Sequence, residues 1–282
     1  MINEIPVSIV ITSIGEDVLL DNLKSLTSKN PKVNEILVII PEEFKKDKFI
    51  DFDNVKFFFT DFKGQVIQRI YGFKKAKNDY VLQLDCDCFI SNLDIEKMYN
   101  SLVNLSDKNH AIAPVYFCDK SNKSIHKFTI GFWSNIKNIL TYFICGSKYS
   151  IFKMGTVSNI GTNYGVDPNY MFNDIFISEW LPGGCVLHYK KNIIFNNYYP
   201  FEGKAYSEDL IHSFFLRNNQ IKLLITKKSK CYTEQPFIPR DYSEFRKFLK
   251  VQKYYWKLLN NNNYIKFYVW RILNYLRFIV QR

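Results

Sequence analysis

From residue 7 to residue 84 the chain alternates short, β-branched apolar runs with stretches of helical periodicity. The expected elements are strands at residues 7–12, 35–40, 55–60 and 79–84, and helices at residues 16–28 and 65–77. Strands that alternate with helices form a mostly parallel sheet with helices on both faces. This pattern predicts an α/β fold in which ligands bind at the carboxyl ends of the strands.

The periodicity is weaker after residue 118. Residues 120–175 mix aromatic residues, Lys, Ser and Asn without a clear repeat. Further on we expect a turn into a strand at 181–189, a helix at 208–218 and a strand at 221–226. From residue 242 the chain has the pattern of two helices interrupted by four consecutive Asn residues, 260–263. We therefore expect one α/β domain at residues 1–235 and a helical extension at residues 236–282.

The net charge of +11 is concentrated in two regions. The last 43 residues, from Arg240, contain ten basic and two acidic residues, and Lys120–Val166 contains six Lys and no acid. Localised basic charge is expected where a surface meets phosphates or anionic lipid. The six Cys form no CxxC pair, which argues against a zinc site or a disulfide framework. The N-terminus lacks a basic signal-peptide region and no run of 18 uncharged apolar residues occurs, so we expect a cytoplasmic protein.

Asp85 and Asp87 directly follow the strand at 79–84. Two carboxylates one residue apart in a turn can converge on one hard cation, Mn²⁺ or Mg²⁺, and such a cation bridges diphosphate oxygens. Acidic residues are also common in turns for purely structural reasons. The Asp85–Cys86–Asp87 triplet alone leaves both the metal-binding and the structural interpretation open.

Ser207, Glu208 and Asp209 open the helix at 208–218. In the structural interpretation, Ser207 is the N-cap of this helix, and the two acids interact favourably with the positive end of the helix dipole. The functional interpretation is a general base that takes a proton from a hydroxyl. His188 and His212 are weaker single candidates for metal ligands, and His212 lies three residues after Asp209.

Five segments in this order resemble the inverting family 2 of nucleotide-sugar glycosyltransferases with the GT-A fold. They are Val7–Ser13, Lys63–Gly72, Tyr80–Asp87, Trp180–Cys185 and Ser207–Asp209. The likeness extends over about residues 5–226, with a nucleotide-binding half at about 1–118 and an acceptor half at about 119–235. The GQxxQR and WLPGG segments resemble those of bacterial capsule or O-antigen sugar transferases.

The resemblance assigns a role to each candidate residue. It implies a nucleotide diphosphate sugar as donor, a UDP-sugar, bound by Thr12, Ser13, Glu42, Lys63, Arg69, Asp85 and Gly184. It also implies that Asp87 and Asp85 hold the divalent cation, and that Asp209 is the catalytic base supported by Glu208. The chain departs from the family at Glu42, where an Asp-Asp-Gly-Ser turn is frequent, and at Cys86 and Cys88, where acids are frequent.

The activity that the resemblance implies is inverting transfer of a sugar to an acceptor hydroxyl, on a lipid-linked oligosaccharide in surface polysaccharide synthesis. Residues 264–280 place basic side chains on one side of a helical wheel and apolar ones on the other. Such a helix lies in a membrane interface or packs on the domain or a second subunit. We expect a peripheral protein on the inner face of the cell membrane, and the oligomeric state and donor sugar remain open.

Two other classes of protein share some of these features. A nucleotidyltransferase also uses paired acids on a metal, but residues 13–16 are too poor in Gly for its phosphate loop. A non-enzymatic nucleic-acid or membrane-binding protein would use the basic tail and the aromatic residues. Because the half with the acidic motifs is close to neutral, we expect no nucleic-acid partner.

Overall fold

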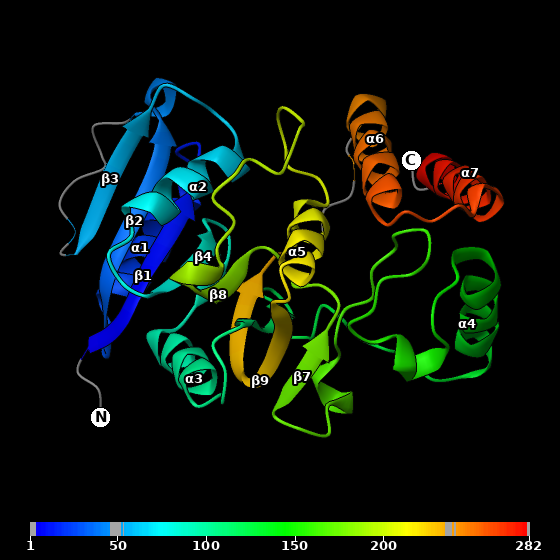
Figure 1. The fold of residues 1–282 in the computed structure, drawn as a ribbon, viewed down its shortest axis with the longest axis horizontal. Helices are drawn as coiled ribbons and strands as arrows, with labels where there is room; N and C mark the ends of the chain where they lie inside the picture. Colours follow the sequence, from blue (N-terminus) through cyan, green and yellow to red (C-terminus); the bar gives the residue numbers. More distant parts are fainter. Residues whose placement is uncertain (1–3, 46–51, 53, 235–238, 240, 281–282) are drawn as a thin grey trace.

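The computed structural model describes residues 4–45, 52, 54–234, 239 and 241–280. Within these residues nine strands form one sheet in the order β3-β2-β1-β4-β8-β6-β9-β5, with β7 paired to β9 (Figure 1). The strands are β1 (Glu4–Thr12), β2 (Lys32–Pro41), β3 (Val55–Thr60), β4 (Tyr80–Asp85), β5 (Phe89–Ile90), β6 (His110–Cys118), β7 (Ile175–Ser178), β8 (Cys185–Tyr189) and β9 (Lys222–Thr233). The α/β class with a central sheet is confirmed.

The strands β3, β2, β1 and β4 are all parallel, as expected from the alternating pattern. Their register places Thr12, the last residue of β1, beside Asp85 of β4 and Ile39 of β2. Parallel strands end at one edge of a sheet, so residues far apart in sequence meet there. This register brings the predicted donor-binding residues of β1 and β4 together.

Beyond β4 the sheet is mixed. β8 runs antiparallel to both β4 and β6, while β6 and β9 are parallel to each other. The short strands β5 and β7 run antiparallel to β9. The purely parallel arrangement is therefore restricted to the first half of the sheet, since the chain enters β8 from a turn at the carboxyl edge and runs back along β4.

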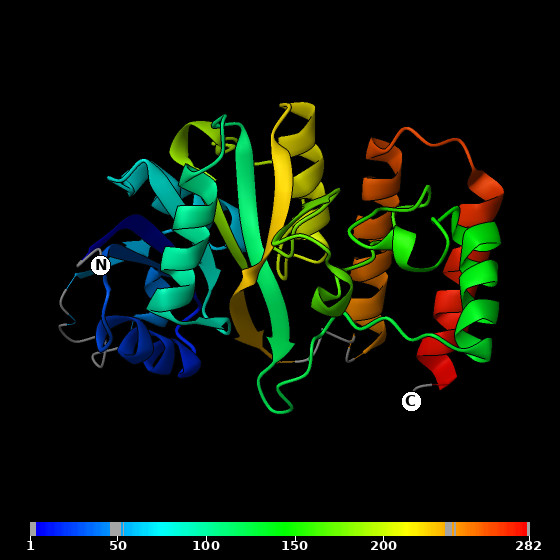
Figure 2. The ribbon, with the colours of Figure 1, turned by 90° about the horizontal axis from the view of Figure 1, so that it is seen from below.

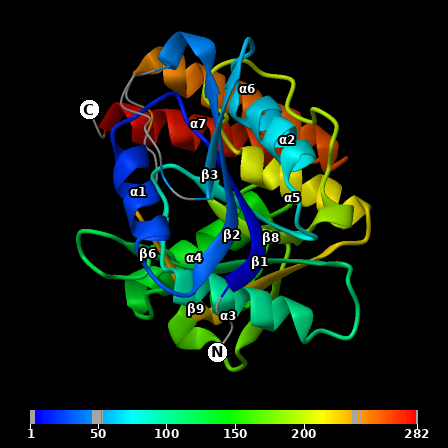
Figure 3. The same cartoon turned by 90° about the vertical axis from the view of Figure 1, so that its left-hand side faces the viewer.

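Helices cover both faces of the sheet. α1 (Val18–Thr27) and α3 (Asn92–Val103) pack in one core cluster, with Leu19, Leu23 and Leu26 of α1 fully or almost fully buried. α2 (Gln65–Lys75) and α5 (Glu208–Asn218) cover the other face, and Figure 3 shows α1 and α2 on opposite sides of the strands. Each buried leucine contributes roughly 1.5–3 kcal/mol. Buried side chains of α2 and α5 belong to one shared core cluster, so these two helices are held against the same face.

Three helices lie beyond the sheet: α4 (Phe132–Cys145), α6 (Tyr242–Leu258) and α7 (Tyr264–Val280) (Figures 1 and 2). α6 packs on the domain because Val251 and Tyr255 join the cluster that holds α2 and α5. α7 rests on α6 through stacked rings, Trp256 on Phe267 at 4.3 Å and Phe245 on Phe278 at 4.4 Å. α4 contacts α7, so α7 connects α4 with α6.

The two tail helices and their break are confirmed, whereas α4 was not predicted. The boundary expected after residue 235 lies outside the described residues. Short 3₁₀ helices complete the elements: η1 (Glu42–Phe44), η2 (Ser150–Lys153), η3 (Pro168–Tyr170) and η4 (Lys190–Asn192).

Candidate active site

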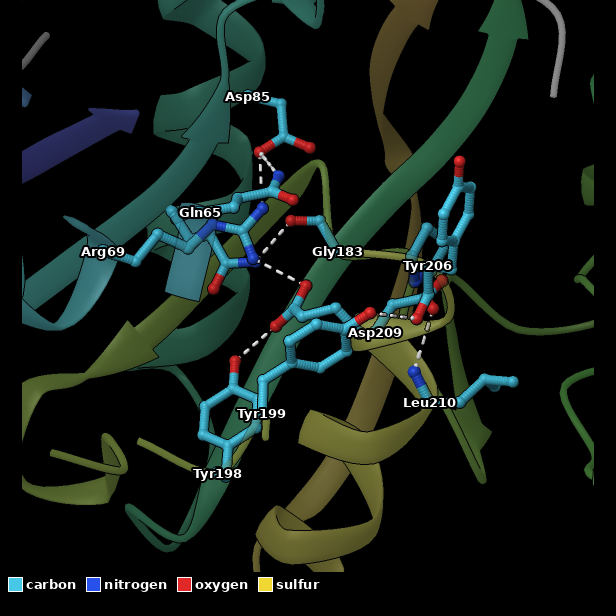
Figure 4. Close-up of polar contacts among 12 residues, drawn as sticks. Gln65, Arg69, Asp85, Gly183, Tyr198, Tyr199, Tyr206, Asp209 and Leu210 are labelled. Atoms are coloured by element: carbon cyan, nitrogen blue, oxygen red, sulfur yellow. Dashed lines mark hydrogen bonds and ion pairs between the residues drawn. The ribbon is translucent and has the colours of Figure 1, made fainter. Parts of the chain in front are cut away.

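The two acidic motifs meet at the carboxyl edge of the sheet. Asp85 ends β4, and Glu208 and Asp209 form the first turn of α5. Figure 4 shows Asp85 beside the guanidinium group of Arg69, which comes from α2, and shows Asp209 beside Leu210 at the start of α5. The structure thus brings together residues from three separate segments of the chain.

Arg69 joins the two motifs by ion pairs. Its Nη2 lies 2.5 Å from Asp85 Oδ1, and its Nη1 lies 2.6 Å from Glu208 Oε2. Gln65, one turn earlier in α2, donates from Nε2 to the same Asp85 oxygen at 3.0 Å. Burial by itself lowers the pKa of Arg69, but the charges of Asp85 and Glu208 reverse this and raise it well above its ordinary value. The guanidinium is fixed as a cation between two carboxylates.

Arg69 is buried between the two carboxylates. The sequence-based assignment places it on the donor phosphates, whereas the residue is only 1% exposed and both Nη atoms are held by carboxylates. Buried charges are tolerated in proteins when they are paired in this way. Arg69 therefore positions Asp85 and Glu208, and its contact with the donor phosphates stays a prediction.

Glu208 and Asp209 have different surroundings, although they are consecutive. Glu208 is buried, with one oxygen on Arg69 and the other accepting a hydrogen bond from the Tyr198 hydroxyl. Asp209 is partly exposed, and its Oδ1 accepts from the backbone N–H of Leu210 at 2.9 Å. Burial, with the charge of Glu208 second, raises the pKa of Asp209 from 3.8 to about 7. Asp209 therefore combines a partly exposed side chain with a pKa near neutrality.

Ser207 does not cap α5 as expected. Its φ is 48°, in the left-handed region, and its side chain makes no cap hydrogen bond. Its hydroxyl instead accepts from Gln252 Nε2 of α6 at 3.1 Å. Non-glycine residues in this region are strained and persist where neighbouring structure holds them. The contact with α6 therefore helps to fix the turn that aims Glu208 and Asp209.

Gly183 and Gly184 are packed between the acidic residues. A Cβ at Gly183 would lie 3.1 Å from Glu208 Oε2 and 3.2 Å from Asp209 Cβ. A Cβ at Gly184 would lie 2.6 Å from Cys88 Sγ, and the Gly184 carbonyl accepts from the Asp85 N–H at 2.8 Å. Glycine at these two positions lets the segment that leads into β8 pass close to Glu208 and Asp85. Contact between Gly184 and the donor stays a prediction.

Asp85 and Asp87 offer oxygen ligands of the kind that a divalent cation takes, with Asp85 Oδ1 already bonded to Arg69 and Gln65, and their role as metal ligands stays a prediction. Asp87 is exposed; desolvation raises its pKa, the charges of Asp85 and Glu16 raise it further, and Lys204 opposes them. A bound cation would relieve this crowding of negative charge, and diphosphate oxygens and water commonly complete such sites. Among the described residues, no group of three or more His, Cys, Asp or Glu could hold a metal. Cys88 lies in the core as expected, and Cys86 is partly buried.

The remaining predicted donor residues lie along the same strand ends. Ser13 follows β1, where its hydroxyl bonds to Glu16 and its carbonyl accepts from Gln68 at 3.2 Å. Glu42 opens η1 and pairs with Lys45 at 3.8 Å. The ammonium group of Lys63 lies 3.0 Å from Glu43 and 4.4 Å from the centre of the Phe44 ring. In the contacts of the described residues, neither Glu42 nor Lys63 joins the Arg69 network, so their donor contacts stay predictions.

A layer of aromatic residues behind the network was missed by sequence reasoning. Tyr198 bonds to Glu208 and stacks on His212, with ring centres 5.0 Å apart and planes 6° apart. Burial lowers the pKa of His212 to about 3, and burial and His212 lower that of His188, whose ring lies 5.5 Å away. Both histidines are therefore neutral parts of the packing. The only signal for Tyr198 was its place in an aromatic-rich run before Glu208.

Comparisons with known proteins find glycosyltransferases similar to this chain. A curated relative from Haemophilus influenzae (strain ATCC 51907 / DSM 11121 / KW20 / Rd), described as an uncharacterized glycosyltransferase, is 31% identical over 116 residues, 37% of this chain and 45% of the relative. Among solved structures, GalNAc-T7 with UDP, GalNAc and Mn²⁺ has a TM-score of 0.58 at 16% identity, covering 90% of this chain and 49% of that one. S. aureus TarS 1-349 in complex with UDP-GlcNAc has a TM-score of 0.52 at 12% identity, covering 88% and 66%.

These structural likenesses establish the GT-A fold. The chain spans about half the length of the first relative and of GalNAc-T7. The model of glycosyl transferase family 2 matches residues 8–156, a range that begins in β1, includes the Asp85–Asp87 turn and ends after η2. Because that match covers more than half of the 282 residues, the chain belongs to glycosyl transferase family 2.

Proposed function

We propose that this chain transfers a sugar from a UDP-sugar to an acceptor hydroxyl with inversion at the anomeric carbon. The observation that carries the proposal is the accessible carboxylate of Asp209, with a pKa of about 7, beside the Asp85–Arg69–Glu208 network. The UDP-bound proteins of the same fold support the choice of donor. Their nucleotides provide the ligands for the first test.

In this mechanism Asp209 accepts the proton of the acceptor hydroxyl as that oxygen attacks the donor. A general base works best with a pKa near the working pH. Glu208 keeps its two oxygens on Arg69 and Tyr198, so it orients the turn while Asp209 takes the proton. Attack from the side opposite to the departing diphosphate inverts the configuration.

Asp87 and Asp85 would hold the divalent cation, which is Mn²⁺ or Mg²⁺. When bound there, it supplies positive charge to the diphosphate that leaves. Thr12 and Ser13 lie next to Asp85 at the same strand ends and would contact the nucleotide. The donor site is therefore assigned to the ends of β1 and β4.

Millimolar UDP with Mn²⁺ is expected to raise the melting temperature by roughly 5–10 °C, because a ligand at ~100 times its Kd adds about 2.7 kcal/mol. GDP and ADP serve as nucleotide controls. Asp87→Asn is expected to remove the part of the shift that depends on Mn²⁺ and to leave the melting temperature without ligand nearly unchanged, since Asp87 is exposed. No shift with any nucleotide would contradict the proposed donor.

α4 and α7 form an exposed apolar surface beside the domain, which we call the α4–α7 face. α4 exposes Phe132, Trp133, Ile139, Leu140, Tyr142 and Phe143, and α7 exposes Ile265, Ile272, Leu276, Ile279 and Val280, each by at least 46%. Both helices carry basic residues and no acid. None of the described helices is long and apolar enough to cross a bilayer.

We infer that the α4–α7 face lies in the interface of an anionic membrane, where the enzyme meets a lipid-linked acceptor for capsule or O-antigen synthesis. Large exposed apolar surfaces mark interaction sites, and basic amphipathic helices suit anionic lipid. Each cation near such a surface adds about 1 kcal/mol. The inner face of the cell membrane is the proposed location.

Ile265→Gln with Ile272→Gln is expected to weaken co-sedimentation with phosphatidylglycerol vesicles by ~10-fold or more, since two large side chains leave the lipid. Leu93→Gln with Ile177→Gln makes the same change at exposed positions of α3 and β7 and should bind as the unmodified chain does. Equal binding by both variants would mean that the α4–α7 face does not bind lipid and instead contacts another protein.

A further inference from the structure

Five of the eight residues that line a cavity between α6 and α7 are cations. Its volume is about 670 Å³, and its lining includes Arg246, Lys247, Lys250 and Lys253 from α6 and Arg271 from α7. We call these five residues the basic groove. None of the described residues that line this cavity is acidic, and Asp241 and Glu244 at the start of α6 are not among them. Five converging cations favour a polyanionic ligand, because each charge attracts the same group.

A second cavity adjoins the basic groove and is lined in part by the segment that precedes Ser207. That cavity has a volume of about 330 Å³ and shares Lys247 and Lys250 with the basic groove. Its opposite wall includes Tyr199, Lys204 and Tyr206 from the segment before Ser207, together with one acid, Glu202. The Tyr199 hydroxyl donates to the Tyr206 carbonyl at 3.0 Å, which holds this wall together.

The wall formed by Tyr199, Lys204 and Tyr206 leads directly into the turn that carries the catalytic acids. Tyr206 precedes Ser207, and Glu208 and Asp209 follow it at the start of α5. Gln252 of α6 donates to the Ser207 hydroxyl at 3.1 Å, so α6 contacts the same turn.

At its other end the basic groove reaches α7, whose outer side belongs to the α4–α7 face. Figure 1 shows α6 between α5, which carries Asp209, and α7. Arg271 lines the groove, while the next residue, Ile272, is 59% exposed. A ligand that crosses this region meets catalytic acids, then cations, then an apolar surface.

We propose that the basic groove binds a diphosphate group, the one that links the sugar of the acceptor to its lipid chain. The acceptor sugar then extends past Tyr199 and Tyr206 toward Asp209, and the hydrocarbon chain leaves over the α4–α7 face. This proposal rests on the proposed function for its acceptor. It adds the chemical class of the carrier and the residues that recognise it.

The test compares two variants of the full chain that lose the same charge from the same helices. Lys250→Ala with Arg271→Ala removes one cation from each wall of the groove, while Lys257→Ala with Arg277→Ala removes exposed cations outside it. Binding of farnesyl diphosphate is measured by calorimetry with UDP and Mn²⁺ present in excess, so that the donor site is occupied. The groove variant is expected to bind ~10-fold more weakly, and the control variant within about twofold of the unmodified chain.

Two further probes identify the source of the diphosphate. Farnesol lacks the charged group and is expected to bind far more weakly than farnesyl diphosphate; equal binding would overturn the proposal. Inorganic pyrophosphate lacks the chain, and if it binds as tightly as farnesyl diphosphate, the assignment to a lipid is wrong. Equal losses in both variants would show a diffuse electrostatic effect and also overturn the proposal.

Single-stranded RNA is the last competitor. If it binds and loses affinity in the groove variant while farnesyl diphosphate does not bind, the groove belongs to nucleic acid. The melting shift with UDP and Mn²⁺ is measured on the same samples. If UDP shifts the melting temperature and farnesyl diphosphate does not bind, only the role of the basic groove is rejected. If farnesyl diphosphate binds and UDP gives no shift, only the proposed donor is rejected.

Discussion

Asp209→Asn is expected to lower turnover by ~100-fold or more while leaving UDP binding intact, because the variant cannot accept the proton of the acceptor. The measurement is UDP release from UDP-sugars in the presence of acceptor, together with the melting shift with UDP and Mn²⁺. Asp119→Asn makes the same change at an exposed position and should retain full activity. Near-normal turnover of Asp209→Asn would remove this residue from the role of base.

The same substitution is expected to stabilise the protein at neutral and higher pH. The pKa of Asp209 is about 7 in the folded chain, against an ordinary 3.8, so the folded state retains a proton that the unfolded state has lost. Stability from this group is complete below pH 3.8, falls as the pH rises and is lost above about 7. Asn removes this loss, and because the side chain is partly exposed we expect a gain of about 1–3 kcal/mol at pH 8.

Urea unfolding at about pH 5 and pH 8 tests this linkage. The advantage of Asp209→Asn over the unmodified chain should increase from the lower to the higher pH. A constant difference would mean that the effect comes from packing and not from ionisation. Gain of stability with loss of turnover is the usual relation at a catalytic group.

Arg69→Met is expected to cost about 3–5 kcal/mol of stability, since it leaves Asp85 and Glu208 without the cation between them. Lys74→Met changes an exposed cation of the same helix and should be nearly neutral. Urea unfolding of both variants measures the difference. A loss of stability below about 1 kcal/mol would contradict the role of Arg69 as the cation that stabilises Asp85 and Glu208.

Two further readouts separate positioning from simple loss of folding. Arg69 lowers the pKa of Asp209, so Arg69→Met should move the acidic limb of the pH–rate profile to higher pH. Adding Glu208→Gln to Arg69→Met should restore part of the stability, because one of the two uncompensated carboxylates is removed. Absence of both effects would reduce Arg69 to a packing residue.

The sequence was most informative where local periodicity and packing agree. The strand at 55–60 and the helix at 208–218 have the predicted bounds, because each has a clear apolar pattern and a defined break on both sides. α4 was missed because its large apolar residues, such as Trp133 and Phe143, are exposed and follow no core-facing stripe. Local pattern reasoning detects helices through the core that they cover.

The site was predictable as motifs but not as a network. Asp85 and Glu208 were identified from short signatures, whereas the Arg69–Glu208 ion pair joins residues 139 positions apart. Ser207 has the residue type of an N-cap, yet its left-handed backbone depends on the contact with Gln252 of α6. Such features depend on tertiary contacts, which one sequence does not contain.

The single guanidinium shared by Asp85 and Glu208 has a thermodynamic consequence. A cation held at Asp85 would compete with Arg69 for the charge of that carboxylate, so the attraction left for Glu208 would change. Binding of the cation and donor at Asp85 would then be coupled to the geometry of the first turn of α5, where the acceptor is bound. Such coupling is reciprocal between donor and acceptor. Donor and acceptor would bind with linked affinities through one buried side chain.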